Sequence, residues 1–290
     1  MTHALSPPAA PGMEMSEQAL RRFYTFFRHQ TGIAFTPAKR YYVESRLRAR
    51  LIASGQDGVE AYLAHLKTPA GTAELEQLIN LLTINETFFY RETRQFEALT
   101  QSVLPELAAL RGPGGVRRLL CMPCATGEEP YSIALHLLAH GLDPVRHHIE
   151  LHGADIDTDA LRAAKAGLYD DETLRHLPGP LRARYFTRQP DGRHQISPAV
   201  RACVQFAHAN ITRTQDMQRY REIDVLFCRN LLIYFDEAAR RHSVRILREC
   251  LRPGGFIFLG HSESMRHMAD LFLTRHFGAV IAYQKPGDVP

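Results

Sequence analysis

The chain has 290 residues, enough for a larger domain with a smaller one beside it. Its 35 basic and 31 acidic residues nearly balance, so the net charge of +4 does not by itself indicate a nucleic-acid partner. Five irregularly spaced cysteines argue against a secreted disulfide framework, and no apolar stretch approaches the ~18 residues of a membrane span, which together predict a cytoplasmic protein without membrane insertion.

The first part of the chain is predicted to be helical. Residues 1–13 are rich in Pro and Ala, and we expect a disordered leader there. An all-helical N-terminal domain is expected over 14–83, with helices at about 16–30, 36–54, 57–67 and 71–83. The second of these helices carries Lys39, Arg46 and Arg50 on one side. That basic side is either a solvated face or a docking surface for an acidic partner.

The segment 84–115 is expected to be a linker followed by a helix. Its first part, INETFFYRE at 84–92, loses helical periodicity and mixes aromatic with polar residues, which is typical of a linker between domains. A helix over 93–110 then leads into a Gly-Pro-Gly-Gly turn.

From 116 to 290 apolar strands alternate with amphipathic helices, which predicts an α/β domain with a parallel sheet. The expected strands cover 118–122, 149–154, 223–228, 256–260 and 280–284, and the expected helices cover 129–139, 158–166 and 236–251. Residues 168–209 interrupt the alternation. We expect a small antiparallel hairpin there, turning at Asp191-Gly192, followed by a returning strand.

The junction at 117–135, RRLLCMPCATGEEPYSIAL, is predicted to be a strand, a tight turn and the start of a helix. Such a helix start offers unpaired N–H groups and a partial positive charge. A phosphate-binding turn normally supplies several glycines and a lysine, whereas this turn has Gly127 and the carboxylates of Glu128 and Glu129. The expected ligand is therefore cationic or rich in hydroxyl groups.

Other polar residues follow the predicted strands, namely Asp155, Asn210-Ile211 and Arg229-Asn230. Ligands of open parallel sheets bind outside the carboxyl ends of the strands. Asp155, 28 positions after Gly127, is placed like the carboxylate that accepts ribose hydroxyls in Rossmann-type sites. Asp157, before Thr158, is more simply a helix N-cap.

Established metal and hydrolase patterns are missing from the sequence. Cys121-x-x-Cys124 has no second cysteine pair at metal spacing, and His136 with His140 lacks a third ligand, so no metal site is expected. There is no Walker lysine, no G-x-S-x-G and no H-E-x-x-H.

Five blocks, in the order and spacing of the family, resemble the CheR family of chemotaxis-receptor glutamate O-methyltransferases: TINETFFYRE, ATGEEPYSIAL, GADIDTDALRAAKAGLY, IDVLFCRNLLIYFD and RPGGFIFLGHSES. The similarity runs from about Ser16 to Lys285. It implies an all-α N-terminal domain and a Rossmann-like S-adenosylmethionine-dependent methyltransferase domain, with an inserted antiparallel β-subdomain at about 183–207. The implied reaction transfers the methyl group of S-adenosylmethionine to glutamate side chains in the cytoplasmic helices of chemoreceptors, leaving S-adenosylhomocysteine.

The resemblance also implies roles for individual residues. Cofactor contacts fall on Asn85, Thr87, Arg91, Glu129, Asp155, Asn210, Ile211, Arg229 and Asn230. Within the GEE run, Glu129 is preferred to Glu128. Arg91 and Tyr234 are implied to act on the substrate side, and Lys39, Arg46 and Arg50 match the region that meets the receptor.

This assignment agrees with the chemistry of the ligand. S-adenosylmethionine carries a sulfonium and an ammonium, which suit a turn with carboxylates, and its ribose offers hydroxyls to Asp155. A glutamate nucleophile has a pKa of about 4.3 and is already ionised at neutral pH, so no general base is needed.

Two observations limit the expected partners. The loop at 187–197 is shorter and poorer in glycine than in family members that hold a receptor C-terminal tether, so we expect no pentapeptide tether. There is no aromatic-lined basic groove for nucleic acid. Two alternatives remain: a methyltransferase for another substrate, and a regulator that senses S-adenosylmethionine without turnover.

Overall fold

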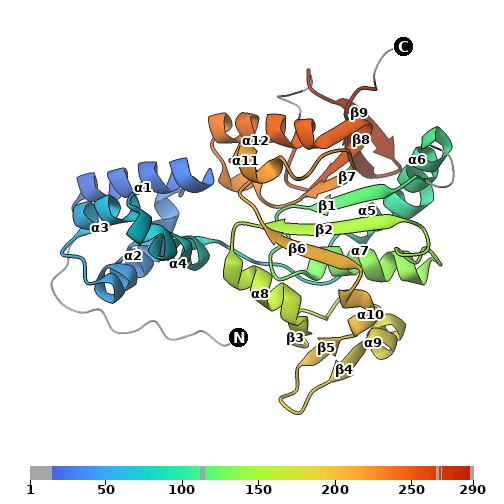
Figure 1. Ribbon diagram of the computed structural model, residues 1–290, viewed down its shortest axis with the longest axis horizontal. Coiled ribbons are helices and arrows are strands. Elements are labelled where there is room, and N and C mark those ends of the chain that lie inside the picture. Colours follow the sequence, from blue (N-terminus) through green and yellow to red (C-terminus); the bar gives the residue numbers. More distant parts are fainter. Residues whose placement is uncertain (1–14, 112–114, 266–267, 269, 288–290) are drawn as a thin grey trace. The chain divides into compact units, whose positions relative to one another are not determined.

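The computed structural model describes residues 15–111, 115–265, 268 and 270–287, and the chain divides into two units, Met1–Leu82 and Thr83–Pro290 (Figure 1). The leader expected at 1–13 lies outside the described residues.

The first unit is all-helical, as predicted. Its elements are α1 (Glu17–Thr31), η1 (Pro37–Lys39), α2 (Arg40–Ser54), α3 (Val59–Leu66), η2 (Pro69–Gly71) and α4 (Thr72–Leu82). The hydroxyl of Ser16 caps α1 by accepting from the Ala19 N–H at 3.1 Å, and Gly32 ends it at φ 79°. Apolar residues at helical spacing are buried at its centre, among them Phe23 and Phe27 of α1 and Leu47 of α2.

The second unit contains the predicted parallel sheet. In the described residues seven strands pair in the order β6-β2-β1-β7-β8-β10-β9, all parallel up to β8, with β10 antiparallel to β8 and β9 antiparallel to β10. Their bounds are β1 (Arg117–Cys121), β2 (Ile149–Asp155), β6 (Val204–His208), β7 (Ile223–Cys228), β8 (Leu251–Leu259), β9 (Leu273–Phe277) and β10 (Val280–Gln284). Every residue of β7 is buried, which explains its unbroken apolar reading.

Helices precede and connect these strands. They are α5 (Thr93–Ala98), the π-helical η3 (Leu99–Val103), α6 (Leu104–Arg111), α7 (Glu128–Ala139), α8 (Thr158–Ala166), α9 (Gly179–Tyr185), α10 (Pro198–Arg201), α11 (Thr214–Met217), η4 (Leu232–Tyr234) and α12 (Glu237–Cys250). The strand order runs outward from β1 through β2 to β6 and then returns to β7 and β8. Right-handed crossovers therefore place α7 and α8 on one face and α12 on the other (Figure 1).

A smaller antiparallel sheet has the order β3-β5-β4, formed by β3 (Leu168–Tyr169), β4 (Phe186–Arg188) and β5 (His194–Ile196). The chain turns between β4 and β5 through Gly192 at φ 87°, as the sequence predicted. The range of about 183–207 expected for the inserted subdomain differs from this sheet at both ends: β3 precedes it, and β6 pairs with β2 of the main sheet. A run of apolar residues predicts a strand but does not show which neighbouring strand it pairs with.

The segment 83–92 belongs to the second unit and is anchored in it. Phe89 is fully buried, and its ring packs edge-to-face on Tyr169 with centroids 4.8 Å apart. The Phe89 N–H donates to the Thr173 main-chain oxygen at 3.0 Å, and the Tyr90 N–H donates to the Ser132 hydroxyl at 2.9 Å. These contacts bring the expected linker beside α7.

Candidate active site

The carboxyl ends of β1, β2 and β7 lie side by side because β1 pairs with both neighbours. The strand order reverses beside β1, which is where open parallel sheets bind ligands. The turn after β1 is fixed to both neighbouring strands: the Met122 N–H donates to the Phe227 oxygen and the Cys124 N–H to the Ala154 oxygen, each at 2.9 Å.

Gly127 ends this turn for steric reasons. Its φ of 95° disfavours other residues, and a Cβ there would lie 3.0 Å from the Cβ of Ala164 and 3.1 Å from the hydroxyl of Tyr169. The glycine therefore allows the turn to pack closely against Ala164 and Tyr169, and α7 begins at the next residue.

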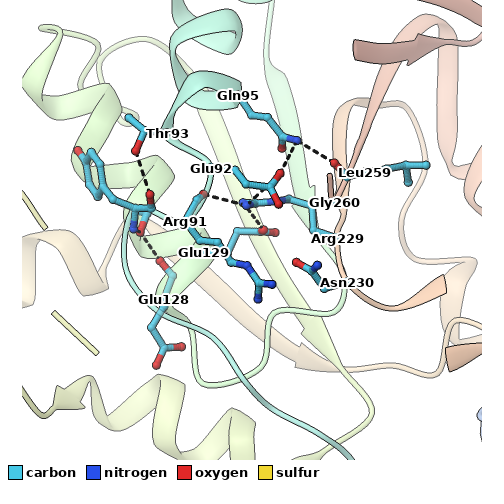
Figure 2. Close-up of polar contacts among 12 residues, drawn as sticks. Arg91, Glu92, Thr93, Gln95, Glu128, Glu129, Arg229, Asn230, Leu259 and Gly260 are labelled. Atoms are coloured by element: carbon cyan, nitrogen blue, oxygen red, sulfur yellow. Dashed lines mark hydrogen bonds and ion pairs between the residues drawn. The ribbon is translucent and has the colours of Figure 1, made fainter. Parts of the chain in front are cut away.

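The two glutamates that open α7 point to different surroundings (Figure 2). Both carboxylate oxygens of Glu128 lie 2.7 Å from the hydroxyl of Thr126, and burial raises the pKa of this carboxyl to about 7. The carboxylate of Glu129 instead accepts from the guanidinium of Arg229, with Oε2 and Nη1 2.7 Å apart. Burial raises the pKa of Glu129, and Arg229 opposes that shift.

Arg229 follows β7 and is the centre of a buried polar cluster. Its side chain is 2% exposed, its Nη2 donates to the main-chain oxygen of Arg91 at 2.8 Å, and the same nitrogen lies 3.5 Å from the carboxylate of Glu92. Figure 2 shows these residues converging from three segments that are distant in the sequence. The cation is thus shared between a carboxylate of α7 and a carboxylate of the segment before α5.

Glu129 and Arg229 each have one polar atom that is buried without a hydrogen-bond partner among the described residues. These atoms are Oε1 of Glu129, an acceptor, and Nε of Arg229, a donor. The thiol of Cys121 opposes the rise in the pKa of Glu129, yet Oε1 has no hydrogen-bond partner among the described residues. Unpaired buried polar atoms cost free energy, so the pair indicates a site for a ligand with one donor and one acceptor group.

Asp155 closes β2 and holds two turns together. Its Oδ2 accepts from the Ala125 N–H at 2.7 Å and its Oδ1 from the Asp157 N–H at 3.0 Å. The residue is buried, and burial raises the pKa of its carboxyl to about 6. Its carboxylate lies between the β1–α7 turn and the β2–α8 turn.

Asp157 has more contacts than its predicted N-cap role requires. Its Oδ1 caps α8 by accepting from the N–H groups of Asp159 and Ala160, each at 2.9 Å. Its Oδ2 accepts from the Thr83 hydroxyl and from the Asn85 amide, each at 2.6 Å. The predicted site residue Asn85 is therefore held at the carboxyl edge of β2 by a carboxylate that the sequence pattern assigned only to capping.

The residues after β6 form a wall beside Asp155. The side-chain oxygen of Asn210 accepts from the N–H and the hydroxyl of Thr212 at 2.9 and 2.7 Å, so this amide shapes its own turn. Ile211 is buried, and the Ala209 N–H donates to the Asp155 main-chain oxygen at 2.9 Å. Both predicted residues thus lie next to the end of β2.

Arg91 and Tyr234 come from different segments of the second unit: Arg91 precedes α5, and Tyr234 follows β7. Arg91 is half-buried, donates to the Glu86 main-chain oxygen at 3.2 Å and has its guanidinium carbon 5.5 Å from the Phe88 ring centroid. Tyr234 ends η4, and burial raises the pKa of its hydroxyl, with Glu86 adding to the shift and Arg91 opposing it. Thr87, on the same segment as Arg91, is half-buried.

The three predicted docking residues have unequal surroundings in the helical unit, and Lys39 ends η1 while only Arg46 and Arg50 lie on α2. Arg50 pairs with the carboxylate of Glu74, with side chains 21% and 12% exposed, and the Tyr62 hydroxyl donates to the same carboxylate at 2.6 Å. Arg46 lies over a tyrosine ring at 3.6 Å and donates to a main-chain oxygen of α4 at 3.1 Å. Lys39 is exposed.

The sequence patterns did not single out Glu92 or Asp157 as residues of the site. Glu92 lies inside the TINETFFYRE block, but nothing in its spacing identifies Arg229 as its partner. Within the described parts of the chain, no helix combines the length and apolarity that a membrane span needs.

Comparison with known proteins agrees with this arrangement. The sequence profile described as "CheR methyltransferase, SAM binding domain" matches residues 85–279, and the profile described as "CheR methyltransferase, all-alpha domain" matches 18–83. The chain is 40% identical over 265 residues to chemotaxis protein methyltransferase 2 of Vibrio cholerae, covering 91% of this chain and 92% of that one. It is 33% identical to the chemotaxis protein methyltransferase of Salmonella typhimurium, with 91% and 89% covered, and 32% identical to chemotaxis protein methyltransferase 1 of Pseudomonas aeruginosa, with 86% and 90% covered.

The expected family, enzyme class and cofactor are confirmed by these matches, as is the division into an all-α part and a cofactor-binding sheet. A profile that spans 85–279 includes every residue assigned above to the cofactor or the substrate. The chain belongs to the CheR methyltransferase family of S-adenosylmethionine-dependent enzymes.

Proposed function

We propose that this methyltransferase forms methyl esters on glutamate side chains in the cytoplasmic helices of chemoreceptors and works in the cytoplasm. The names of the relatives in Vibrio, Salmonella and Pseudomonas, all chemotaxis protein methyltransferases, support a receptor substrate. The observation that carries the assignment is the cluster around Arg229, with its unpaired atoms at the carboxyl ends of β1 and β7.

The donors and acceptors of the cluster fit the cofactor. S-adenosylmethionine supplies a methyl group on a sulfonium, and its amino-acid end carries one ammonium and one carboxylate. Oε1 of Glu129 would accept from the ammonium, and Nε of Arg229 would donate to the carboxylate, so both unpaired atoms gain partners. Asp155 would accept the ribose hydroxyls, while Asn85, Thr87, Arg91, Asn210, Ile211 and Asn230 would complete the pocket.

The substrate glutamate needs orientation more than activation. Its carboxylate is ionised at neutral pH, so the task of the protein is alignment and exclusion of water. Arg91 would attract the carboxylate, and Tyr234 would donate a hydrogen bond to it. Burial raises the pKa of Tyr234 above its ordinary value, which keeps the hydroxyl protonated as a donor.

Two alternatives use the same fold: methylation of another substrate, and sensing of the cofactor without turnover. The residue types of Arg91 and Tyr234 favour a carboxylate substrate, because a cation and a neutral hydroxyl donor together suit an anion. A sensor has no use for such a pair beside the cofactor cluster.

The receptor is proposed to dock on the helical unit through Lys39, with Arg46 and Arg50 adding positive potential from their partnered positions. We further propose that no receptor C-terminal pentapeptide tether is used, because the turn between β4 and β5 is short. Tight binding of such a pentapeptide to the full chain in calorimetry would contradict the second proposal.

The function is tested by incubating the protein with methyl-labelled S-adenosylmethionine and receptor cytoplasmic fragments, then treating the product with mild alkali. Methyl esters release the label, N-methyl groups keep it, and a sensor transfers none. Arg91→Ala and Tyr234→Phe should each slow transfer by at least about tenfold, corresponding to about 1.4 kcal/mol of transition-state stabilisation. Tyr24→Phe is the matched control, since Tyr24 is another half-buried tyrosine with a pKa raised by burial but lies on α1.

A further inference from the structure

Glu263, in the loop after β8, accepts four main-chain hydrogen bonds. Its Oε1 accepts from the N–H groups of Leu231 at 3.0 Å and Leu232 at 2.7 Å. Its Oε2 accepts from those of Asn230 at 2.7 Å and Gly260 at 2.8 Å. A carboxylate offers about four acceptor positions, so this side chain is fully engaged. It has no acceptor position left for a hydrogen bond from the substrate.

The loop after β7 has a backbone that requires such an anion. Asn230 adopts a left-handed conformation with φ 59°, and Leu231 returns to the right-handed region at φ −113° and ψ −48°. Successive N–H groups in this alternation point to one side and form an anion-binding concavity. The concavity of this loop is filled by the carboxylate of Glu263, so η4 begins on N–H groups that already have an acceptor.

Gly260 allows the two loops to approach. A Cβ at this position would lie 2.8 Å from Nδ2 of Asn230 and 2.9 Å from Oε2 of Glu263, which would displace one of them. The Glu263 N–H donates to the Gly260 oxygen at 2.9 Å, closing a turn that aims the side chain at the neighbouring loop. The loop after β8 is thus shaped to present this carboxylate.

We infer that Glu263 is a positioning residue for methyl transfer, acting by holding the segment that carries Asn230 and Tyr234. The inference rests on the proposed function, in which Asn230 meets the cofactor and Tyr234 meets the substrate carboxylate. The two side chains stand at the ends of one short segment whose first three N–H groups are bound by a single carboxylate. Without that carboxylate the start of η4 is no longer held in place, and the Tyr234 hydroxyl is no longer oriented.

The first measurement is hydrogen exchange of the full-length protein, followed by mass spectrometry of the peptide containing 230–232. In Glu263→Gln the side chain keeps one oxygen, and its NH₂ group faces N–H donors instead of accepting from them. Hydrogen bonds to a charged group contribute about 1.5–3 kcal/mol, so exchange of these amides should accelerate by at least about tenfold. Glu249→Gln, an exposed glutamate on α12, should leave the peptide unchanged. Unchanged exchange in Glu263→Gln would overturn the inference.

The second measurement is a double-mutant cycle on receptor methylation. Glu263→Gln should lower kcat by at least about tenfold, and adding Tyr234→Phe should slow it little further, because both changes remove the same oriented hydroxyl. Combined with Asp155→Asn, which acts at β2, the losses should instead multiply. Multiplying losses with Tyr234→Phe would overturn the inference.

Glu263→Asp serves where the amide variant folds poorly, as judged by circular dichroism. It retains the charge but is one methylene shorter, so it should fall between the wild type and Glu263→Gln in both measurements. Exchange and kcat as in the wild type would show that the four contacts are not needed and would overturn the inference. A wild-type protein that transfers no label to receptor fragments would contradict the proposed function itself, which keeps the two failures distinct.

Discussion

Replacing Glu129 by glutamine tests the centre of the site, because the change removes a charge but keeps the shape of the side chain. In the structure Oε2 of Glu129 accepts from Arg229 and Oε1 has no partner. The glutamine oxygen can still accept from Arg229, while its NH₂ group then occupies the place of the unpaired acceptor. A ligand ammonium approaching that position meets a donor.

The magnitude follows from the lost contact. A hydrogen bond between ionised groups contributes about 1.5–3 kcal/mol, which corresponds to a dissociation constant about 10 to 150 times larger. The free energy of unfolding should change by only about 1 kcal/mol, since Arg229 keeps Glu92 and the Arg91 oxygen as partners and a neutral side chain is less costly to bury.

The assay is isothermal titration calorimetry with S-adenosylmethionine and S-adenosylhomocysteine, which share the amino-acid end. Glu129→Gln should bind both compounds more weakly, and by a similar factor. The matched control is Glu128→Gln, because this neighbouring carboxyl is also on the first turn of α7 and is buried, but faces Thr126. Wild-type affinity of Glu129→Gln for both compounds, or an equal loss of affinity in Glu128→Gln, would contradict a ligand ammonium at Oε1 of Glu129.

Three further predictions concern stability. The folded-state pKa of Glu128, about 7, lies above its unfolded value of about 4.5, so ionisation costs stability as pH rises from 4.5 through 7. Glu128→Gln should therefore raise the free energy of unfolding by on the order of 3 kcal/mol above pH 7 and leave it unchanged at pH 4, as measured by urea unfolding. An increase that does not depend on pH would contradict this prediction. Asp157→Ala should lower the free energy of unfolding by about 2 kcal/mol, because it removes both the α8 cap and the contacts to Thr83 and Asn85. Asp159→Ala, at an exposed position, should lower it less. Arg50→Ala should cost about 1–3 kcal/mol in thermal unfolding, since it leaves the carboxylate of Glu74 without its guanidinium; an unchanged midpoint would show that the pair is only a surface contact.

Much of the fold could be predicted from periodicity. The helices of the first unit and the strands β1, β2 and β7 lie within a few residues of their predicted bounds, because buried apolar runs and caps are local signals. The strand β9 was not predicted. It lies at the edge of the sheet, and most of its residues are exposed, so its sequence lacks an apolar run.

The candidate site, like the fold, could be predicted from the sequence only in part. Asp155 and Glu129 could be placed from their positions after a strand and at a helix start. The partners of Arg229 could not, because Glu92 and Glu129 reach it from segments 137 and 100 positions away, and no local pattern encodes such pairing. The pairing of Asp157 with Asn85 and of Arg50 with Glu74 was missed for the same physical reason, since each depends on tertiary packing.

The anchoring of the segment 83–92 decides where the two units of this protein can be separated. A shortened chain beginning at Thr83 keeps the Phe89 ring in the core and the main-chain oxygen of Arg91 beside Arg229. A chain beginning at Thr93, where α5 starts, lacks both and has a cavity in place of the fully buried Phe89 ring. This cavity should lower the free energy of unfolding by on the order of 3–5 kcal/mol. The residues that look like a connector are thus part of the larger folding unit, and the bond between Leu82 and Thr83 marks its edge.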